Sequence, residues 1–392
     1  NMQSELKREI AFLARKKLSD KVRQLEKDRD YRNKFEKRSG RKAPEPSYSQ
    51  TKFVDKHFDP KHCLRNKNLI SKSMWRSCQE LSYKPKPSIL VKIPKPDGSF
   101  REIMEFTIPD AALSRVMYRR LTARNIKKQS SDSYAYRPDR TLFDALLRLS
   151  NSIGEQKTFI SEYDFKAYFD SIPHHYLTKL IENPEIFTTT KIERSVLKSF
   201  LQHQFAEKKD YLAGNFSKRK IGTPQGSSIS LLLANLANDP LDKSLEKLNG
   251  QFVRYADDVV NITYNYEDAL RVENAFFEHC SNSGIQLNIK KSKGISVLSK
   301  FGQELRNSES FNYLGYKISK DQLEMSDKAV ENIKQKISDR IHIYLHRHPR
   351  SKNLGYSSSR AGPGYDWDLI GCVSEIRNII YGGLTENRIK NS

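Results

Sequence analysis

The stretch FVRYADDVVNI, Phe252–Ile262, places two adjacent carboxylates, Asp257 and Asp258, between apolar residue pairs. The apolar residues on both sides predict a strand, a tight turn and a second strand. Two neighbouring anions in such a segment repel each other and lose solvation, which disfavours the folded state. An aspartate pair at a turn is also ordinary turn chemistry, so residues elsewhere in the chain must decide whether the pair has a function.

The composition indicates a folded protein that binds a polyanion, most simply nucleic acid or an anionic membrane. A hydrophobic content of 37% is compatible with a packed core, and the formal net charge of +22 points to a polyanionic partner. No apolar run approaches the roughly 20 residues of a membrane span, and the first residues are charged and lack the apolar region of a signal peptide, so we expect no membrane association. Scattered cysteines without a CxxC pair argue against a zinc site and favour a reducing, cytoplasmic location (Cys63, Cys78, Cys280 and Cys372).

Sequence patterns divide the chain into three parts. Residues 1–50 predict a basic helical N-terminal extension, as one helix or a helix pair, followed by a linker. Residues 51–320 alternate strands with helices and hairpins, and residues 321–392 are mainly helical. This order predicts an α+β fold with a largely antiparallel sheet. The extension is either docked on the protein body or an arm that contacts nucleic acid, and the sequence leaves both open.

Individual elements follow from hydrophobic periodicity and turn residues. A Pro-Asp-Gly turn predicts a β-hairpin over residues 89–106. A strand beginning at Thr158 places Asp164 near its end. Further along the chain, we expect a helix over 227–248 and strand structure over 285–299.

Carboxylate and basic side chains from several segments together suggest a candidate site. If the strand before Asp164 and the hairpin with Asp257 and Asp258 are neighbours, three carboxylates converge at one sheet edge. Such oxygen ligands fit Mg²⁺, and two ions about 4 Å apart would serve phosphoryl transfer. Basic residues of the 89–106 hairpin suit a triphosphate, and the GTPQGSSIS turn lets its backbone approach a nucleotide closely (Lys92, Lys95 and Arg101; Gly222–Ser230).

Read in order, these motifs resemble those of reverse transcriptases. YADD at 255–258, DFKAYFDSI at 164–172 and GTPQGSSIS at 222–230 are similar to the palm motifs of that family. SYAYRPDRTLFDAL at 133–146, GIQLNIKKSK at 284–293 and FNYLGYKIS at 311–319 resemble segments of the bacterial, group II intron-like branch. The resemblance extends from Ile89 to Ser319, with all motifs in family order.

The resemblance implies a right-hand polymerase fold, with fingers and palm over 51–320, palm motifs at about 159–319, and a helical thumb over 321–392. It implies an RNA-directed DNA polymerase that uses two Mg²⁺ ions. The implied metal ligands are three carboxylates and one backbone carbonyl, with a lysine that protonates the leaving pyrophosphate (Asp164, Asp257, Asp258 and the carbonyl of Phe165; Lys291). The implied nucleotide contacts include an aromatic steric gate against the 2′-hydroxyl, Phe169, and the basic residues of the hairpin (also Phe165, Gln225, Gly226, Arg101, and Lys92 or Lys95).

Departures from relatives favour the antiphage-defence reverse transcriptases. We find no HNH endonuclease motif, no full maturase domain, and no VTG or NAxxH segment typical of retrons. The expected partners are a structured non-coding RNA, deoxynucleoside triphosphates and the DNA product, while a homo-oligomer or a partner protein stays open. Template-independent or protein-primed synthesis by the same site is an alternative. A non-catalytic RNA-binding scaffold is the alternative from another class, although it predicts loss of the carboxylates.

Overall fold

The computed structural model describes residues 1–43, 53–95, 98–299, 307–347, 361–362 and 365–382. It divides into two compact units. The first comprises Asn1–Leu18, Lys52–Phe311 and Ser319–Asp321, and the second Ser19–Thr51, Asn312–Ile318 and Gln322–Ser392. Most of the predicted linker at 39–49, most of a predicted loop at 352–366, and residues 96–97 of the hairpin turn lie outside the described residues.

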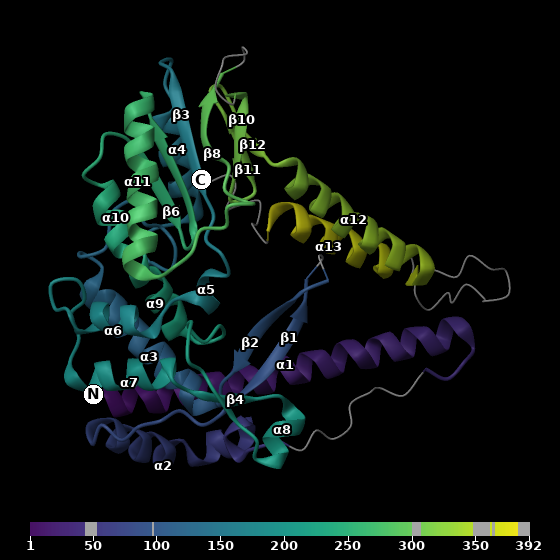
Figure 1. Cartoon of the computed structure of the whole chain (residues 1–392). Helices are drawn as coiled ribbons and strands as arrows, with labels where there is room; N and C mark the ends of the chain where they lie inside the picture. Colours follow the sequence, from purple (N-terminus) through teal and green to yellow (C-terminus); the bar gives the residue numbers. More distant parts are fainter. Residues whose placement is uncertain (44–52, 96–97, 300–306, 348–360, 363–364, 383–392) are drawn as a thin grey trace. The chain divides into compact units, whose positions relative to one another are not determined.

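A five-stranded sheet with the order β6-β7-β3-β8-β9 forms the centre of the first unit (Figure 1). The middle strand, β3, is antiparallel to both neighbours, β7 and β8, and only the edge pair β8–β9 is parallel. The α+β class with a largely antiparallel sheet is therefore confirmed. The strands are β3 (Thr158–Tyr163), β6 (Gln251–Tyr255), β7 (Asp258–Thr263), β8 (Gly294–Leu298) and β9 (Asn307–Ser308).

Two helices pack directly on this sheet. Helix α11 (Tyr266–Ser283) crosses β3 and β7, and it ends at Gly284, whose φ of 75° is the left-handed conformation of a helix C-terminus. Helix α4 (Leu142–Ser152) packs along β6 and begins with a capping box in which Thr141 and Asp144 exchange hydrogen bonds. The two helices thereby cover apolar side chains of the sheet.

The predicted helix over 227–248 is wrong as a single element. It consists of α9 (Ser228–Ala237) and α10 (Asp239–Leu245), which are separated at Asn238. Pro240 has no amide hydrogen to donate to the carbonyl four residues earlier, so the helix restarts instead of continuing. The expected strand structure over 285–299 is also only partly correct, because the sole strand there is β8 and a turn occupies 289–291.

The predicted hairpin over 89–106 is confirmed as β1 (Ser88–Pro94) and β2 (Phe100–Glu105). Lys92 pairs with Glu102 and Ile93 with Arg101 in its antiparallel register. The hairpin belongs to a four-stranded sheet of order β2-β1-β4-β5, completed by β4 (Gln204–Ala206) and β5 (Ser217–Lys218).

Further helices complete the first unit and share one apolar core with the sheet. None of the helices in the described part of the chain has both the length and the apolar composition of a membrane span. The elements are η1 (Lys56–Phe58), α2 (Pro60–Gln79), α3 (Ile108–Asn125), α5 (Tyr168–Ser171), α6 (His174–Glu182), α7 (Lys191–Leu201) and α8 (Lys208–Ala213).

The N-terminal extension is one continuous helix, α1 (Met2–Ser39), and not a helix pair. Its first turns belong to the core, where Leu6 and Ile10 are completely buried. Glu9, itself 8% exposed, pairs with Arg115 and Arg119 of α3 at 2.6 and 2.7 Å. The beginning of the helix is therefore docked on the body, whereas a nucleic-acid contact by its later turns stays a prediction.

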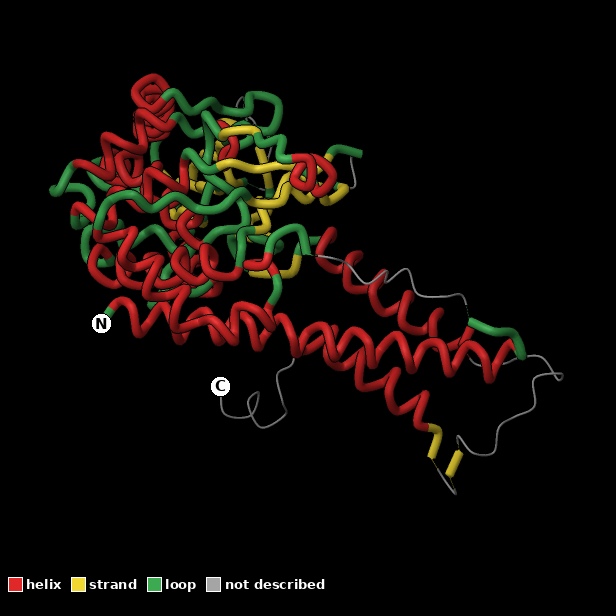
Figure 2. Tube along the Cα trace, turned by 90° about the horizontal axis from the view of Figure 1, so that it is seen from below, coloured by secondary structure: helices red, strands yellow, loops and turns green. Residues whose placement is uncertain are grey.

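The second unit contains two helices that lie side by side, α12 (Asp327–Arg347) and α13 (Trp367–Tyr381) (Figure 2). A half-buried apolar stripe on α12 follows the predicted helical spacing (Val330, Ile333 and Ile337). The remaining strands form two small sheets, one of order β10-β11-β12 and one of β13 with β14. Their bounds are β10 (Ser310–Tyr313), β11 (Tyr316–Ser319), β12 (Leu323–Met325), β13 (Ala361–Gly362) and β14 (Tyr365–Asp366).

Docking of α1 predicts a strong difference between two leucines of the same helix. Leu6→Ala should lower the free energy of unfolding by about 2–5 kcal/mol, because it opens a cavity in the core. Leu25→Ala should change it by less than about 0.5 kcal/mol, because Leu25 is 46% exposed. Urea unfolding followed by circular dichroism measures both, and equal effects of the two substitutions would contradict the docked arrangement.

Candidate active site

The YADD segment forms a hairpin with a two-residue turn. Strand β6 ends at Tyr255 and β7 begins at Asp258, and these two residues pair across the turn. Ala256 and Asp257 form the turn itself, and Ala256 has a φ of 63°, in the left-handed region that favours glycine. The tight turn places the two carboxylates at the very end of the sheet.

Asp164 comes to the same sheet edge through the pairing of β3 with β7. Tyr163 is opposite Val259, and continuing this register by one residue brings Asp164 opposite Asp258. The backbone of Asp164 is held on its other side, where its N–H donates to Ser292 Oγ at 3.0 Å and its carbonyl accepts from the Asn288 N–H at 2.7 Å. The convergence expected from the sequence is thus present in the sheet geometry.

The three carboxylates interact electrostatically. Burial raises the pKa of Asp257, and the charge of Asp164 raises it further, while Arg101 and Arg254 oppose the shift. Burial also raises the pKa of Asp258 to about 6, with added repulsion from Asp257 and Asp164 and opposition from Lys291. The Asp258 side chain is exposed to solvent, so its desolvation is partial and arises from the crowded protein surface around it.

Lys291 is brought near the carboxylates by a turn. Its N–H donates to the Asn288 carbonyl at 3.1 Å, and Asn288 is itself bonded to the backbone of Asp164. The exposed Lys291 side chain lies close enough to Asp258 to lower the pKa of that carboxyl group. The turn that replaced the expected strand therefore presents this cation to the sheet edge.

The GTPQG turn packs against the segment that follows Asp164. The N–H groups of Gly222 and Thr223 donate to the carbonyls of Ile172 and Phe169 at 2.8 and 2.7 Å. A Cβ on Gly222 would lie only 2.6 Å from the carbonyl oxygen of Asp170, so a larger residue would push the two segments apart.

The same turn contacts the hairpin β1–β2. The Met104 N–H donates to the Gln225 carbonyl at 2.7 Å, and a Cβ on Gly226 would lie 2.3 Å from the Met104 carbonyl oxygen. Gly226 also has a φ of 113°, which side chains rarely adopt. Glycine at this position thus allows the turn to lie directly on β2.

Aromatic and amide groups flank the carboxylates. Phe165 is 3% exposed, and an isolated bridge joins its backbone to Leu287. Phe169 is half-buried against the core. Gln225 Nε2 donates to Asp170 Oδ2 at 3.2 Å, which turns its amide oxygen in the opposite direction.

The basic residues of the hairpin differ in their surroundings. Lys92 forms an ion pair of 2.5 Å with Glu207. Arg101 pairs with Ile93 in the register, so it projects from the opposite face of the hairpin to Lys92, and its charge acts on Asp257. Lys95 follows Ile93 by two positions, so the alternation of side chains along the strand places it on the same face as Ile93. Its charge opposes the rise in the pKa of Asp170. The structure therefore separates Lys92 from Arg101 and groups Lys95 with it.

No ready-made metal cluster is present in the described ranges, since they contain no group of three or more His, Cys, Asp or Glu that could hold an ion. The charges of Asp164, Asp257 and Asp258 affect one another, but the three side chains do not form a ligand group of this kind.

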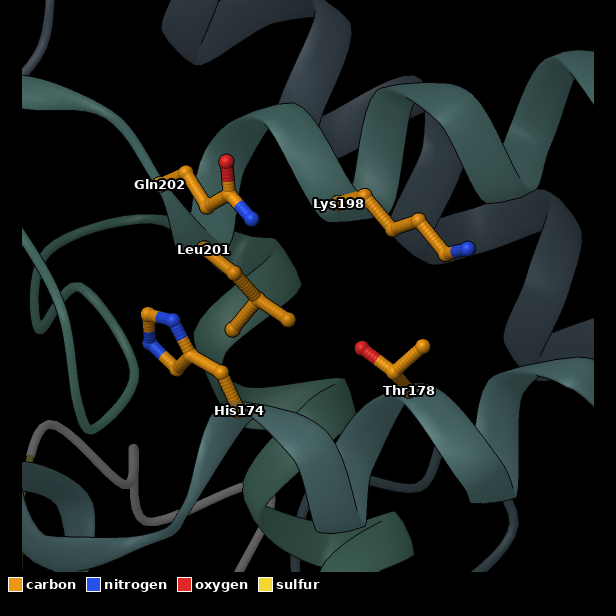
Figure 3. Close-up of a pocket in the computed structure, with 5 residues that line it drawn as sticks. All are labelled: His174, Thr178, Lys198, Leu201 and Gln202. Atoms are coloured by element: carbon orange, nitrogen blue, oxygen red, sulfur yellow. The ribbon is translucent and has the colours of Figure 1, made fainter.

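A cavity of about 160 Å³ lies between α6 and α7 (Figure 3). Its lining contains none of the residues predicted for the site. His174, at one side of this cavity, donates through its Nε2–H to the Gly222 carbonyl at 2.8 Å, so it supports the GTPQG turn. The lining residues are His174, Thr178, Lys198, Leu201 and Gln202.

Three residues near the site were not predicted from the sequence. Tyr136 lies close enough to Asp257 and Asp258 for their charges to contribute to its raised pKa, about 12, whose largest cause is burial. Asp170 holds Gln225, and Arg254 is a buried cation three positions before Asp257. Arg254 is a charged residue within an apolar strand, and this is the signal that could have identified it. Tyr136 lies within the SYAYRPDR motif, where no such contrast marks it.

The chain is similar in sequence to parts of several known proteins. The chain is 30% identical over 164 residues to the putative COX1/OXI3 intron 1 protein of Saccharomyces cerevisiae, which covers 42% of this chain and 19% of the yeast protein. It is 33% identical over 132 residues to the group II intron-encoded protein LtrA of Lactococcus lactis, which covers 34% and 20%. Protein YkfC of Escherichia coli is 25% identical over 171 residues, 42% of each chain. The chain thus spans about a fifth of the intron proteins and less than half of YkfC.

Among solved structures, telomerase from Candida albicans in complex with a fragment of telomeric RNA aligns with a TM-score of 0.48 and 13% identity, over 81% of this chain and 62% of that one. The model of the family described as reverse transcriptase (RNA-dependent DNA polymerase) matches residues 93–318. This match covers more than half of the 392 residues and includes every motif around the sheet edge. The chain belongs to the reverse transcriptase family.

Proposed function

We propose that the chain is an RNA-directed DNA polymerase whose active site is the sheet edge at Asp164, Asp257 and Asp258. The observation that carries the proposal is the β3–β7 register, which brings Asp164 opposite Asp258 in a chain of the reverse transcriptase family. A structural aspartate pair would not require a third carboxylate at this place. Lys291 on one side and Arg101 on the other supply the cations that a triphosphate reaction needs.

The donor set fits Mg²⁺, which prefers hard oxygen ligands. Asp164, Asp257 and Asp258, with the backbone carbonyl of Phe165, would hold two ions. When bound, Mg²⁺ supplies charge stabilisation for in-line phosphoryl transfer. The raised pKa values of Asp257 and Asp258 support this assignment, because burial and the neighbouring carboxylates disfavour their charged forms, and perturbed carboxylates of this kind are typical of functional sites.

The chain's own residues would position the nucleotide. Arg101 and Lys95 share one face of the β1–β2 hairpin and would bind the triphosphate, whereas Lys92 is already paired with Glu207. Lys291 would donate a proton to the leaving pyrophosphate.

On the other side of the nucleotide, Phe169 would lie under the sugar and exclude a 2′-hydroxyl. Gln225, held through its amide by Asp170, would contact the incoming nucleotide and the template, with Gly226 allowing close approach. The carbonyl of Phe169 is fixed by Thr223, so the gate and the GTPQG turn form one rigid unit.

We further propose that a structured non-coding RNA is the template or scaffold and that residues 321–392 serve as the thumb. The proposed biological role is antiphage defence in the cytoplasm. The net charge of +22 supports binding to RNA phosphates. The defence role rests on the sequence departures from the intron-encoded and retron reverse transcriptases alone. Sequencing the nucleic acid that copurifies with the protein tests the RNA partner, and phage plating on cells with and without the gene tests the role; no discrete RNA and equal plating would contradict them.

Loss of one carboxylate should abolish polymerisation. Asp257→Asn should reduce deoxynucleotide incorporation on a primed RNA template by at least about 100-fold, because a metal-holding charge is lost. Asp210→Asn, at an exposed helix position, should match the wild type. EDTA should stop the wild-type reaction and Mg²⁺ should restore it. Equal incorporation by wild type and Asp257→Asn would favour a non-catalytic scaffold.

Carboxylate repulsion should appear in the pH dependence of stability without metal. The pKa of folded Asp258 is about 6 against a reference of 3.8, so its contribution to stability is fully present below pH 3.8 and is lost as pH rises through 6. Asp258→Asn should therefore be increasingly more stable than the wild type as the pH rises from 4 to 7 in EDTA.

A matched control should change stability in the opposite direction as the pH rises. Hydrogen bonds from Thr141 lower the pKa of Asp144, so Asp144→Asn should lose stability relative to the wild type above pH 4. Thermal unfolding across this pH range measures both variants. A difference between Asp258→Asn and wild type that does not change with pH would contradict the assignment.

The steric gate predicts a change in sugar selectivity. Phe169→Val should reduce discrimination against ribonucleotides by about 10- to 100-fold, because the smaller side chain leaves room for the 2′-hydroxyl. Tyr168→Phe is the control, since it removes only the hydroxyl that donates to the Ala234 carbonyl at 2.6 Å. The ratio of kcat/KM for the two nucleotide types is the readout, and unchanged selectivity of Phe169→Val would exclude Phe169 as the gate.

A further inference from the structure

Arg254 is a fully buried cation beside the YADD turn. It is 1% exposed, and its ion-pair partner Asp242, on α10, is completely buried. Burial of a guanidinium group is unfavourable unless its donors are hydrogen-bonded. Its Nε donates to Asp242 Oδ1 at 2.6 Å, and Nη2 donates to the other carboxylate oxygen. This pair accounts for the charge of Arg254 but leaves its third nitrogen for other partners.

The remaining nitrogen, Nη1, reaches the turn itself. It donates to the backbone carbonyl of Ala256 at 3.0 Å and to Asn235 Oδ1 at 2.7 Å. The Ala256 carbonyl belongs to the peptide group that continues into Asp257. Fixing this oxygen fixes the plane of that peptide, and with it the direction in which the Asp257 backbone enters β7.

The turn needs such support because its backbone is strained. Ala256 has a φ of 63°, and a residue with a side chain adopts this conformation at a cost of about 1–3 kcal/mol unless its surroundings determine it. The hydrogen bond from Arg254 acts on this residue directly.

Arg254 is in turn anchored to neighbouring elements. Its backbone pairs with a neighbouring segment, donating to the Asp132 carbonyl at 2.8 Å and accepting from the Tyr134 N–H at 2.9 Å. Asn235, on α9, accepts from Ser133 Oγ at 3.3 Å. The guanidinium group thus connects the turn to α9, α10 and the SYAYRPDR segment.

We propose that Arg254 is a positioning residue that sets, through the Ala256 carbonyl, the direction in which Asp257 and Asp258 present their oxygens. It touches neither nucleotide nor metal. The alternative is that Arg254 only stabilises the fold by balancing the charge of Asp242. For its effect on DNA synthesis the inference rests on the proposed function, whereas its effect on the turn does not.

Two variants separate positioning from charge balance. Arg254→Met with Asp242→Leu removes both buried charges together, so no unpaired ion is left in the core. Arg254→Lys keeps the charge but has no planar fork that reaches Asp242, Asn235 and Ala256 at once. The control, Arg124→Met with Glu193→Gln, removes another partly buried bidentate pair, between α3 and α7, that contacts no residue of the site.

The first measurement is hydrogen–deuterium exchange of the full chain without metal. Both Arg254 variants should exchange the amides of residues 256–259 faster by about tenfold or more, because a charge-assisted hydrogen bond to the turn is lost. The control pair should leave this exchange unchanged. If the turn of Arg254→Lys exchanges at the wild-type rate, the proposal is overturned. Arg254→Lys provides this test even if the double variant does not fold.

The second measurement is Mn²⁺ binding by electron paramagnetic resonance, together with DNA synthesis at varied Mg²⁺. The Arg254 variants should bind Mn²⁺ about 10- to 100-fold more weakly and synthesise DNA about 100-fold more slowly, with a nearly unchanged KM for deoxynucleotides. Metal binding and rates equal to those of the control pair would overturn the proposal. A wild type that makes no DNA would refute the proposed function instead, while exchange and Mn²⁺ binding would still test Arg254.

Discussion

The antiparallel pairing of β3 with β7 is the constraint on which the site depends. The register places Tyr163 opposite Val259, so the first residue after β3 meets the first residue of β7. A slip of one residue would turn the side chains of a strand to the other face of the sheet and separate Asp164 from Asp258. Because β3 also pairs with β8 on its other side, and buried side chains occupy both of its faces, such a slip would disrupt the whole core.

The sheet edge combines this rigid register with neighbouring negative charges. Asp164 adds to the field at Asp257 and Asp258, and the opposing cations, Lys291 and Arg101, lie on exposed segments. By contrast, the core neutralises its ions locally, as in the pairs of Glu9 and Asp242 with arginines. Three carboxylates gathered at one end of the sheet make that end suited to a cationic ligand.

Close backbone contacts join the surrounding segments to this edge. Gly222 lies on Asp170 and Gly226 lies on Met104, and neither position has room for a side chain. These contacts connect the GTPQG turn both to the segment after Asp164 and to the β1–β2 hairpin. The residues that would contact a nucleotide are thereby held by backbone hydrogen bonds, which vary less in geometry than long side chains do.

Much of this arrangement could be predicted from the amino-acid order. The α+β class, the hairpin at 89–106, the YADD turn and the convergence of three aspartates follow from apolar periodicity and motif order, since these depend on residues near in sequence. The choice between Lys92 and Lys95 could not be predicted, because it depends on Glu207, more than a hundred positions away. The break at Asn238 was missed because the apolar pattern continues through Pro240.

Arg254 shows most clearly which features the sequence determines and which depend on the tertiary structure. The sequence by itself determined that a charged residue lies three positions before Asp257 in an apolar strand. Only the tertiary structure decided that α9 and α10 bring Asn235 and Asp242 to its guanidinium group and that its last nitrogen reaches Ala256. Local periodicity specifies strands and turns, but the partners of a buried charge come from other elements, and their positions are set by packing of the whole core.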